Sequence, residues 1–196
     1  MSLRHNILRN MTAKMLTETC KDVRLEPPLN PLSGEVLNET TANSSDEARV
    51  DVAARGFWIS GQKAFFDIRV FNPLAKRYRN SKVSNSCRMN ETEKKRQYNE
   101  RILNVEHGSF TPLVFSAMGG MGRESQMFFK RLSESLSDSR CQQLSVTVTW
   151  IRRKVIFALM KSVILCLRGS RTPWVKDNLT DSLSNSSENN ELLCSF

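Results

Sequence analysis

The chain has 196 residues, of which 25% are charged and 39% are hydrophobic, and it contains only 8 glycines and 6 prolines. This composition suits a protein with a packed core and excludes a wholly disordered, collagen-like or low-complexity chain. The net charge is +9; residues 172–196 contain one lysine and four acidic residues, so residues 1–171 carry +12. A body this basic favours a polyanionic partner, with nucleic acid (DNA, or RNA as a second option) ahead of an anionic membrane surface.

The cysteines and the apolar segments argue against a secreted or membrane protein. The five cysteines are scattered, form no C-x-x-C pair and lie far in sequence from both histidines, which disfavours a zinc site or a disulfide framework. The first ten residues are charged where a signal peptide is apolar. The longest apolar run, 155–167, is shorter than the roughly 20 residues that span a bilayer. We expect a nuclear or cytoplasmic protein that is not secreted.

The N-terminal half predicts a helix followed by a β-hairpin. Apolar residues recur at helical spacing over residues 5–23, and three prolines then start a loop over residues 25–45. Residues 49–71 alternate between apolar and polar in their second half, which is typical of a strand. The turn residues Ser60-Gly61-Gln62 predict an antiparallel hairpin, and Asn72-Pro73 ends its second strand.

The C-terminal half predicts a further strand among helices. A basic connector, 76–95, leads into a helix over residues 91–103, and the later elements are a strand at 110–117 and helices at 123–137 and 145–167. The order α, β, β, α, β, α, α predicts an α/β (α+β) fold in which a small mixed β-sheet with an antiparallel hairpin is flanked by helices. We expect one domain over residues 1–171 and a disordered polar, acidic tail over 172–196.

The second hairpin strand places charged side chains together. Burial of Phe66, Ile68 and Val70 forces Asp67 and Arg69 onto the opposite face. A carboxylate beside a fixed cation suits a divalent metal next to a phosphate, and Asp51 brings a second carboxylate into the same sheet. The alternative is an Asp67–Arg69 ion pair with Asp51 as a surface acid.

The predicted hairpin keeps the two aspartates apart. A turn at residues 60–62 would pair Asp51 with Phe71, which leaves Asp51 and Asp67 on the order of 13 Å apart at about 3.4 Å per residue. One metal ion cannot bridge that distance. A shared site therefore requires a bulge or strong twist near Arg55-Gly56.

The spacing of these residues resembles the PD-(D/E)xK signature of restriction-like nucleases. It resembles more closely the restriction-like endonuclease region of site-specific non-LTR retrotransposons. The resemblance covers roughly residues 4–171 and depends on five motifs taken in order: Arg4-His5-Asn6, Glu26-Pro27, Arg49-Val50-Asp51-Val52, Phe66-Asp67-Ile68-Arg69-Val70 and Lys94-x-x-x-Tyr98. Val50 replaces the motif proline. That family's core is a helix, a small mixed sheet and further helices, close to the predicted order.

The resemblance implies a set of site residues. Asp51 and Asp67 would bind Mg²⁺ or Mn²⁺, with Glu18 or Glu26 as the additional acid. Arg69 stands where the wider family usually has lysine, and arginine does not readily exchange a proton near neutral pH. Lys94 would supply the missing ammonium, with Tyr98 one helical turn further along the same face.

These features favour a metal-dependent DNA endonuclease domain of retroelement origin, in which Asp51, Asp67, Arg69, Lys94 and Tyr98 form the active site. One alternative is a catalytically inactive nucleic-acid-binding relic. Another is an interaction protein that docks through the apolar helix over residues 155–167. The basic residues of the connector either follow a DNA backbone or form a solvated loop; they are Lys76, Arg77, Arg79, Lys82 and Arg88.

Overall fold

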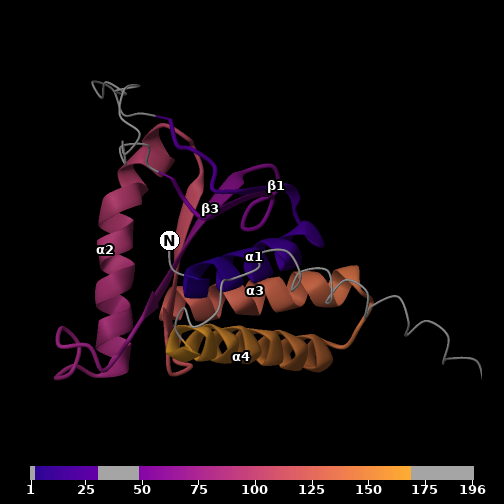
Figure 1. The fold of residues 1–196 in the computed structure, drawn as a ribbon. Helices are drawn as coiled ribbons and strands as arrows, with labels where there is room; N and C mark the ends of the chain where they lie inside the picture. The colour runs from indigo at the N-terminus through magenta and orange to yellow at the C-terminus, as the bar shows by residue number, and fades with distance from the viewer. Residues whose placement is uncertain (1–2, 31–48, 169–196) are drawn as a thin grey trace, which may run out of the picture. The chain divides into compact units, whose positions relative to one another are not determined.

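The computed structural model describes residues 3–30 and 49–168 (Figure 1). Its elements, in chain order, are α1 (Leu3–Thr17), β1 (Lys21–Leu25), β2 (Val52–Arg55), β3 (Lys63–Phe71), α2 (Val83–Asn104), β4 (Ser109–Ser116), α3 (Arg123–Ser139) and α4 (Leu144–Arg168). The fold is mixed α/β, with a four-stranded mixed sheet and helices beside it, as the sequence predicts.

The strands follow their sequence order in the sheet, β1-β2-β3-β4. The first three are antiparallel neighbours, whereas β3 and β4 run parallel over their whole length. Parallel neighbours need a long crossover connection, and α2 provides it. This helix connects the central strand β3 to the edge strand β4, and it lies over the face of β3 that carries Asp67 (Figure 1).

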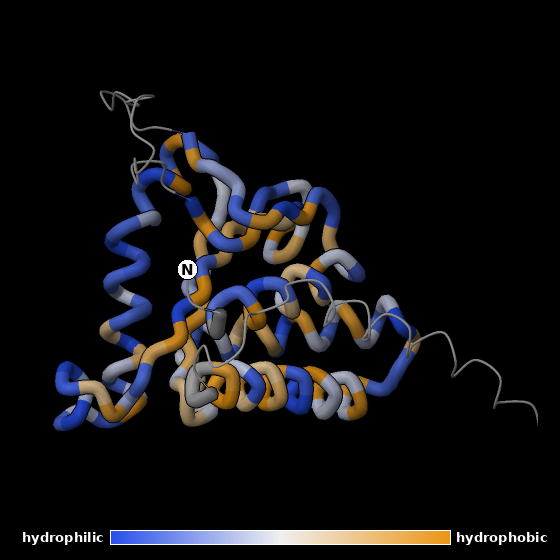
Figure 2. The backbone as a smooth tube through the Cα atoms, viewed as in Figure 1, coloured by the Kyte–Doolittle hydropathy of each residue, from blue (hydrophilic) through white to orange (hydrophobic). Residues whose placement is uncertain are grey.

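Helices cover both faces of the sheet. On one face α2 packs through Tyr98 and Ile102 against Phe65 and Phe110. On the other face α1, α3 and α4 enclose the main core, in which Phe66 is fully buried. Most of α2 is hydrophilic (Figure 2). It therefore contributes a polar surface as well as a short apolar contact.

The first strand was not predicted. The helix expected over residues 5–23 ends at Thr17, and β1 follows it as an edge strand. Four of its five residues are exposed, so it lacks the alternation that marks a half-buried strand. A register shift between Lys21 and Arg24, with Asp22 at φ 50°, further disguises it. Residues 31–45 of the predicted loop lie outside the described residues.

The helix predicted to start at residue 91 begins at Val83. The buried positions in its first turns are Ser86, Cys87, Asn90 and Glu91, which are polar or small rather than apolar. The sequence therefore shows no apolar helical periodicity that would predict the start of this helix. The other three predicted elements are confirmed to within two residues at each end, as β4, α3 and α4.

The hairpin register differs from the prediction and corrects it. Residues 56–62 form the connection, and Val52 pairs with Phe66 rather than with a residue near Phe71. Gly56 ends β2 with a φ of +89°, and Phe57 turns into the core, where it is 2% exposed. The longer loop moves the strands past each other by four residues. The pairing from Val52 to Arg55 is regular, and no bulge near Gly56 is required.

The described residues up to Cys166 form one compact unit. The tail predicted for residues 172–196 lies outside the described part of the chain. None of the helices described in residues 3–30 and 49–168 combines the length and apolar character that crossing a bilayer would need.

Candidate active site

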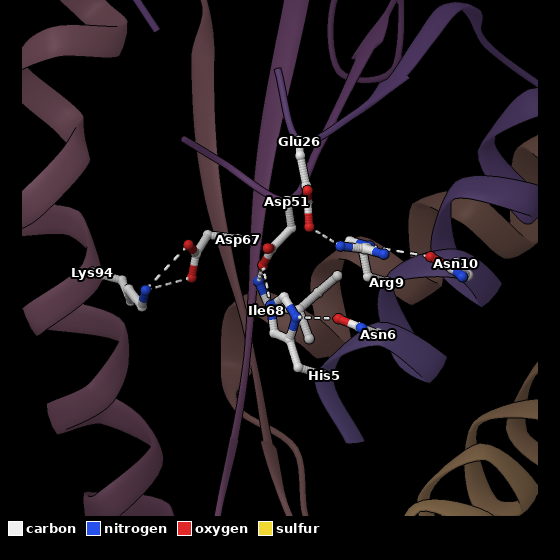
Figure 3. A network of polar contacts seen from close by, with 9 residues as sticks. All are labelled: His5, Asn6, Arg9, Asn10, Glu26, Asp51, Asp67, Ile68 and Lys94. Carbon is white, nitrogen blue, oxygen red and sulfur yellow. Dashed lines mark hydrogen bonds and ion pairs between the residues drawn. The ribbon is translucent and has the colours of Figure 1, made fainter. Parts of the chain in front are cut away.

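The β2–β3 register brings Asp51 and Asp67 together. The backbone N–H of Asp51 donates to the carbonyl of Phe66 at 3.1 Å, which continues the ladder one residue beyond Val52. The backbone N–H of Ile68 donates to Oδ2 of Asp51 at 2.5 Å. The Asp51 side chain is thus held on β3, beside Asp67 (Figure 3). Both residues are buried, at 7% and 4% exposed, so Asp51 is not a surface acid.

Both aspartates open onto one pocket of about 660 Å³. Four parts of the chain contribute to it: α1, the segment just before β2, β3 with the residue after it, and α2. Its lining residues are His5, Arg49, Asp51, Asp67, Ile68, Arg69, Val70, Asn72, Lys94 and Tyr98. The predicted site residues Asp51, Asp67, Arg69, Lys94 and Tyr98 are all among them.

Lys94 is the cation that reaches Asp67. Its Nζ donates to Oδ1 of Asp67 at 3.1 Å and lies 2.9 Å from Oδ2, and the two side chains are 17% and 6% exposed. Burial raises the pKa of Asp67 to about 6, although the Lys94 ammonium acts in the opposite direction. Oδ2 of Asp67 is buried, and the Lys94 ammonium is its ion-pair partner.

Arg69 lines the pocket but does not pair with Asp67. Its Nη1 lies 3.3 Å from Oε1 of Glu93 on α2. Tyr98 is buried, and its ring packs beside that of Phe110 at 5.5 Å. Burial first, and then the charges of Asp67 and Asp51, raise the pKa of Tyr98 to about 12, so its phenol stays neutral at physiological pH.

His5 joins the site from α1, and no role was predicted for it. Its Nε2 bonds to Oδ2 of Asp51 at 2.8 Å, and this hydrogen bond raises the pKa of the imidazole above its ordinary value against the effect of burial. Its Nδ1 faces the side-chain oxygen of Asn6 at 3.4 Å. The Arg4-His5-Asn6 motif was the available signal, because it places an imidazole among the site's motifs.

Of the two candidate glutamates, Glu26 lies beside the site. Its backbone N–H donates to the carbonyl of Asp51 at 2.9 Å, and its carboxylate pairs with Arg9 (Figure 3). The structure does not bring Glu18 to the aspartates. Both Glu18 oxygens accept hydrogen bonds from Arg140 at 2.8 and 2.9 Å, just after the C-terminal end of α1, whereas His5 contacts Asp51 from near its N-terminal end.

The residues present fit a divalent cation held by two carboxylates. Mg²⁺ is commonly bound by one or two acidic side chains, with water and substrate phosphate as its other ligands. Both oxygens of Asp67 lie close to the Lys94 ammonium, at 3.1 and 2.9 Å, so a bound ion would share this carboxylate with Lys94. Among the described residues no group of three His, Cys, Asp or Glu side chains could hold a metal. Asp51 and Asp67 are the two carboxylates available in this pocket.

Comparison with known proteins assigns no role to this pocket. No model of a protein family matches the sequence, and no curated protein matches it. What these residues do must therefore be inferred from their geometry and chemistry.

We expect the charge on Asp67 to lower stability as pH rises. Its pKa is about 6 in the folded state and 3.8 as the ordinary value. The folded protein therefore holds this proton more tightly than the unfolded chain does. The resulting contribution to the free energy of unfolding is fully present below pH 3.8 and is lost as pH rises through 6. At about 1.4 kcal/mol per pKa unit, the loss is at most about 3 kcal/mol.

Urea unfolding of the wild type and of Asp67→Asn between pH 4 and 8, in chelator, measures this loss. The stability of the wild type relative to the variant should fall with increasing pH and level off above about pH 7. A difference that stays constant or increases with pH would show that Asp67 does not carry the raised pKa.

Proposed function

We propose that the chain is a metal-dependent DNA endonuclease domain of retroelement origin that hydrolyses phosphodiester bonds. One observation carries this proposal: Asp51 and Asp67, on neighbouring strands, share a pocket with Lys94, which is ion-paired to Asp67. Two carboxylates and an ammonium are the chemical set of the PD-(D/E)xK signature. Here the ammonium comes from a helix rather than from the strand position that Arg69 occupies.

The convergence of separate sequence motifs supports the same function. His5, Glu26, Asp51, Asp67 and Lys94 belong to five different motifs of the resemblance. Contacts link them in two groups, His5–Asp51–Glu26 and Asp67–Lys94, and both groups meet where the start of β2 lies beside the middle of β3 (Figure 3). The helix, the mixed sheet and the later helices also agree with the core expected for such a nuclease.

Each residue has a physical role in this proposal. Bound Mg²⁺ would supply an activated water and charge for phosphodiester hydrolysis. Lys94 supplies a fixed positive charge where negative charge develops on the phosphate. His5 and the backbone N–H of Ile68 fix the carboxylate of Asp51, which removes its freedom to turn from the pocket. Arg69 contributes charge for phosphate binding.

A second candidate is an inactive nucleic-acid-binding relic, and the Lys94–Asp67 ion pair also favours it. With an ammonium 2.9 Å away, the charge of Asp67 is already compensated without a metal. Such a chain would keep the fold and the basic surface and would bind DNA without cleaving it. Cleavage assays separate the two candidates.

The proposal predicts metal-dependent nicking of DNA. The purified chain should nick supercoiled DNA with Mg²⁺ or Mn²⁺ and stop when chelator is added. Asp67→Ala should reduce nicking to background because it removes a metal ligand, whereas Asp138→Ala, at an exposed position on α3, should leave it unchanged. Cleavage in chelator, or full activity of Asp67→Ala, would contradict the proposal.

The proposal also predicts that Lys94 contributes to turnover more than to DNA affinity. Lys94→Ala should lower turnover by about 100-fold, the usual cost of removing a group that stabilises transition-state charge. Its DNA affinity should match that of Lys95→Ala, since the two variants lose the same charge from the same helix. Lys95 pairs with Glu124, not with the pocket carboxylates. Cleavage rates and affinities are measured side by side; equal losses of turnover would reduce Lys94 to part of the basic surface.

A further inference from the structure

The carboxylate of Glu93, on the exposed side of α2, joins two arginines from different elements. Its Oε1 lies 3.3 Å from Nη1 of Arg69 on β3, and its Oε2 accepts a hydrogen bond of 3.2 Å from Nη2 of Arg77 in the loop after β3. Each oxygen thus serves one guanidinium. The two arginines are called the arginine fork below.

The arginine fork lies between the candidate active site and a second pocket. Arg69 follows Asp67 by two residues on the same face of β3, about 7 Å along the strand. Arg77 and Glu93 line a pocket of about 650 Å³ that follows α2, together with Arg88 and Arg96. Positive charge therefore continues from the site along the exposed side of the helix.

The loop that carries Arg77 is anchored. The neighbouring Tyr78 is 6% exposed, packs on Phe71 and donates a hydrogen bond from its hydroxyl to the side-chain oxygen of Asn90 at 3.0 Å. The guanidinium of Arg77 lies 5.6 Å from the centre of the Tyr78 ring. Arg69 sits on a central strand. The chain positions that carry both arms of the fork are therefore fixed before any ligand arrives, which reduces the entropic cost of binding.

A phosphate can take the place of Glu93. Guanidinium groups bind carboxylate and phosphate oxygens with the same planar donor geometry, and a phosphate offers its oxygens to both arginines at once. The Glu93 side chain is 45% exposed, and ion pairs that are this exposed contribute little to stability. Its hydrogen bond to Arg69 lowers the pKa of Glu93, so the carboxylate stays charged at physiological pH. Displacing it from the fork costs the fold little.

We propose that the arginine fork binds a backbone phosphate of DNA and that Glu93 occupies this site in the free protein as an internal competitor. The identity of the ligand rests on the proposed function, which supplies DNA as the substrate. Entry of the DNA strand displaces Glu93, and Arg69 then holds a phosphate next to the one at Asp67 and Lys94. Glu93 weakens every DNA complex by the work needed to displace it.

Glu93→Gln tests this proposal against Glu100→Gln. Both changes remove one negative charge from an exposed position of α2, so they alter the long-range field equally, but Glu100 does not line the pocket. Affinity for a labelled duplex of random sequence is measured by fluorescence anisotropy in chelator, which prevents cleavage. Glu93→Gln should bind about 5 to 10 times more tightly than Glu100→Gln. Thermal unfolding of the two variants should agree.

Arg77 provides the second arm of the test. Arg77→Gln should weaken binding and reduce the log–log salt slope by about 0.9, the value for one lost phosphate contact. In the Arg77→Gln background, Glu93→Gln should lose most of its effect. Arg79→Gln, two residues further along and outside the pocket lining, should change the slope less.

Three results would contradict phosphate binding by the arginine fork. They are equal affinities of the Glu93→Gln and Glu100→Gln variants, weaker binding by Glu93→Gln, and no DNA binding by the wild type. The two proposals fail separately. If the chain binds DNA through the arginine fork but never cleaves it, the proposal for the fork stands and the proposed nuclease activity is wrong. If the chain nicks DNA and the Glu93→Gln and Glu100→Gln variants bind it equally, the proposed nuclease activity stands and the proposal for the fork is wrong.

Discussion

The pairing of Val52 with Phe66 is the constraint on which the candidate site depends. Since side chains alternate along a strand, a slip of one residue would turn Asp51 away from Asp67. Phe57 opposes such a slip from within the connecting loop. Its ring packs at 5.3 Å from that of Phe66 and at 4.8 Å from that of Phe128 on α3. The main core therefore fixes the loop, and the loop fixes the register that brings the carboxylates together.

Two buried carboxylates on adjacent strands repel each other, and each needs a partner. The structure supplies one from each side of the sheet: His5 on α1 for Asp51, and Lys94 on α2 for Asp67. Buried charges are tolerated where they are paired and hydrogen-bonded. The helices that bury the sheet thus also balance its charge. A divalent cation at Asp67 would share that carboxylate with the Lys94 ammonium.

The sequence predicted the fold class because β3, β4 and the last two helices carry clear apolar patterns. Its strand pattern singled out Asp67 and Asp51 as candidates, whereas Lys94 became a candidate only through the resemblance to restriction-like nucleases. It missed β1 because an exposed edge strand has no apolar face, and it missed the hairpin register because Ser60-Gly61-Gln62 is a good local turn, while the burial of Phe57 depends on α3. Ion pairs between side chains of different elements, such as Glu93 with Arg69, produce no periodic pattern in the sequence and could not be predicted from it.

The proposed function requires Asp51 and Asp67 to share one cation, and metal binding tests this requirement without reference to cleavage. Isothermal titration of the full chain with Mn²⁺ should show one site, which disappears in both Asp51→Asn and Asp67→Asn. Glu18→Gln, which changes an acid that pairs with Arg140 instead, should bind Mn²⁺ like the wild type. Unchanged Mn²⁺ binding in either aspartate variant, or its loss in Glu18→Gln, would contradict the account.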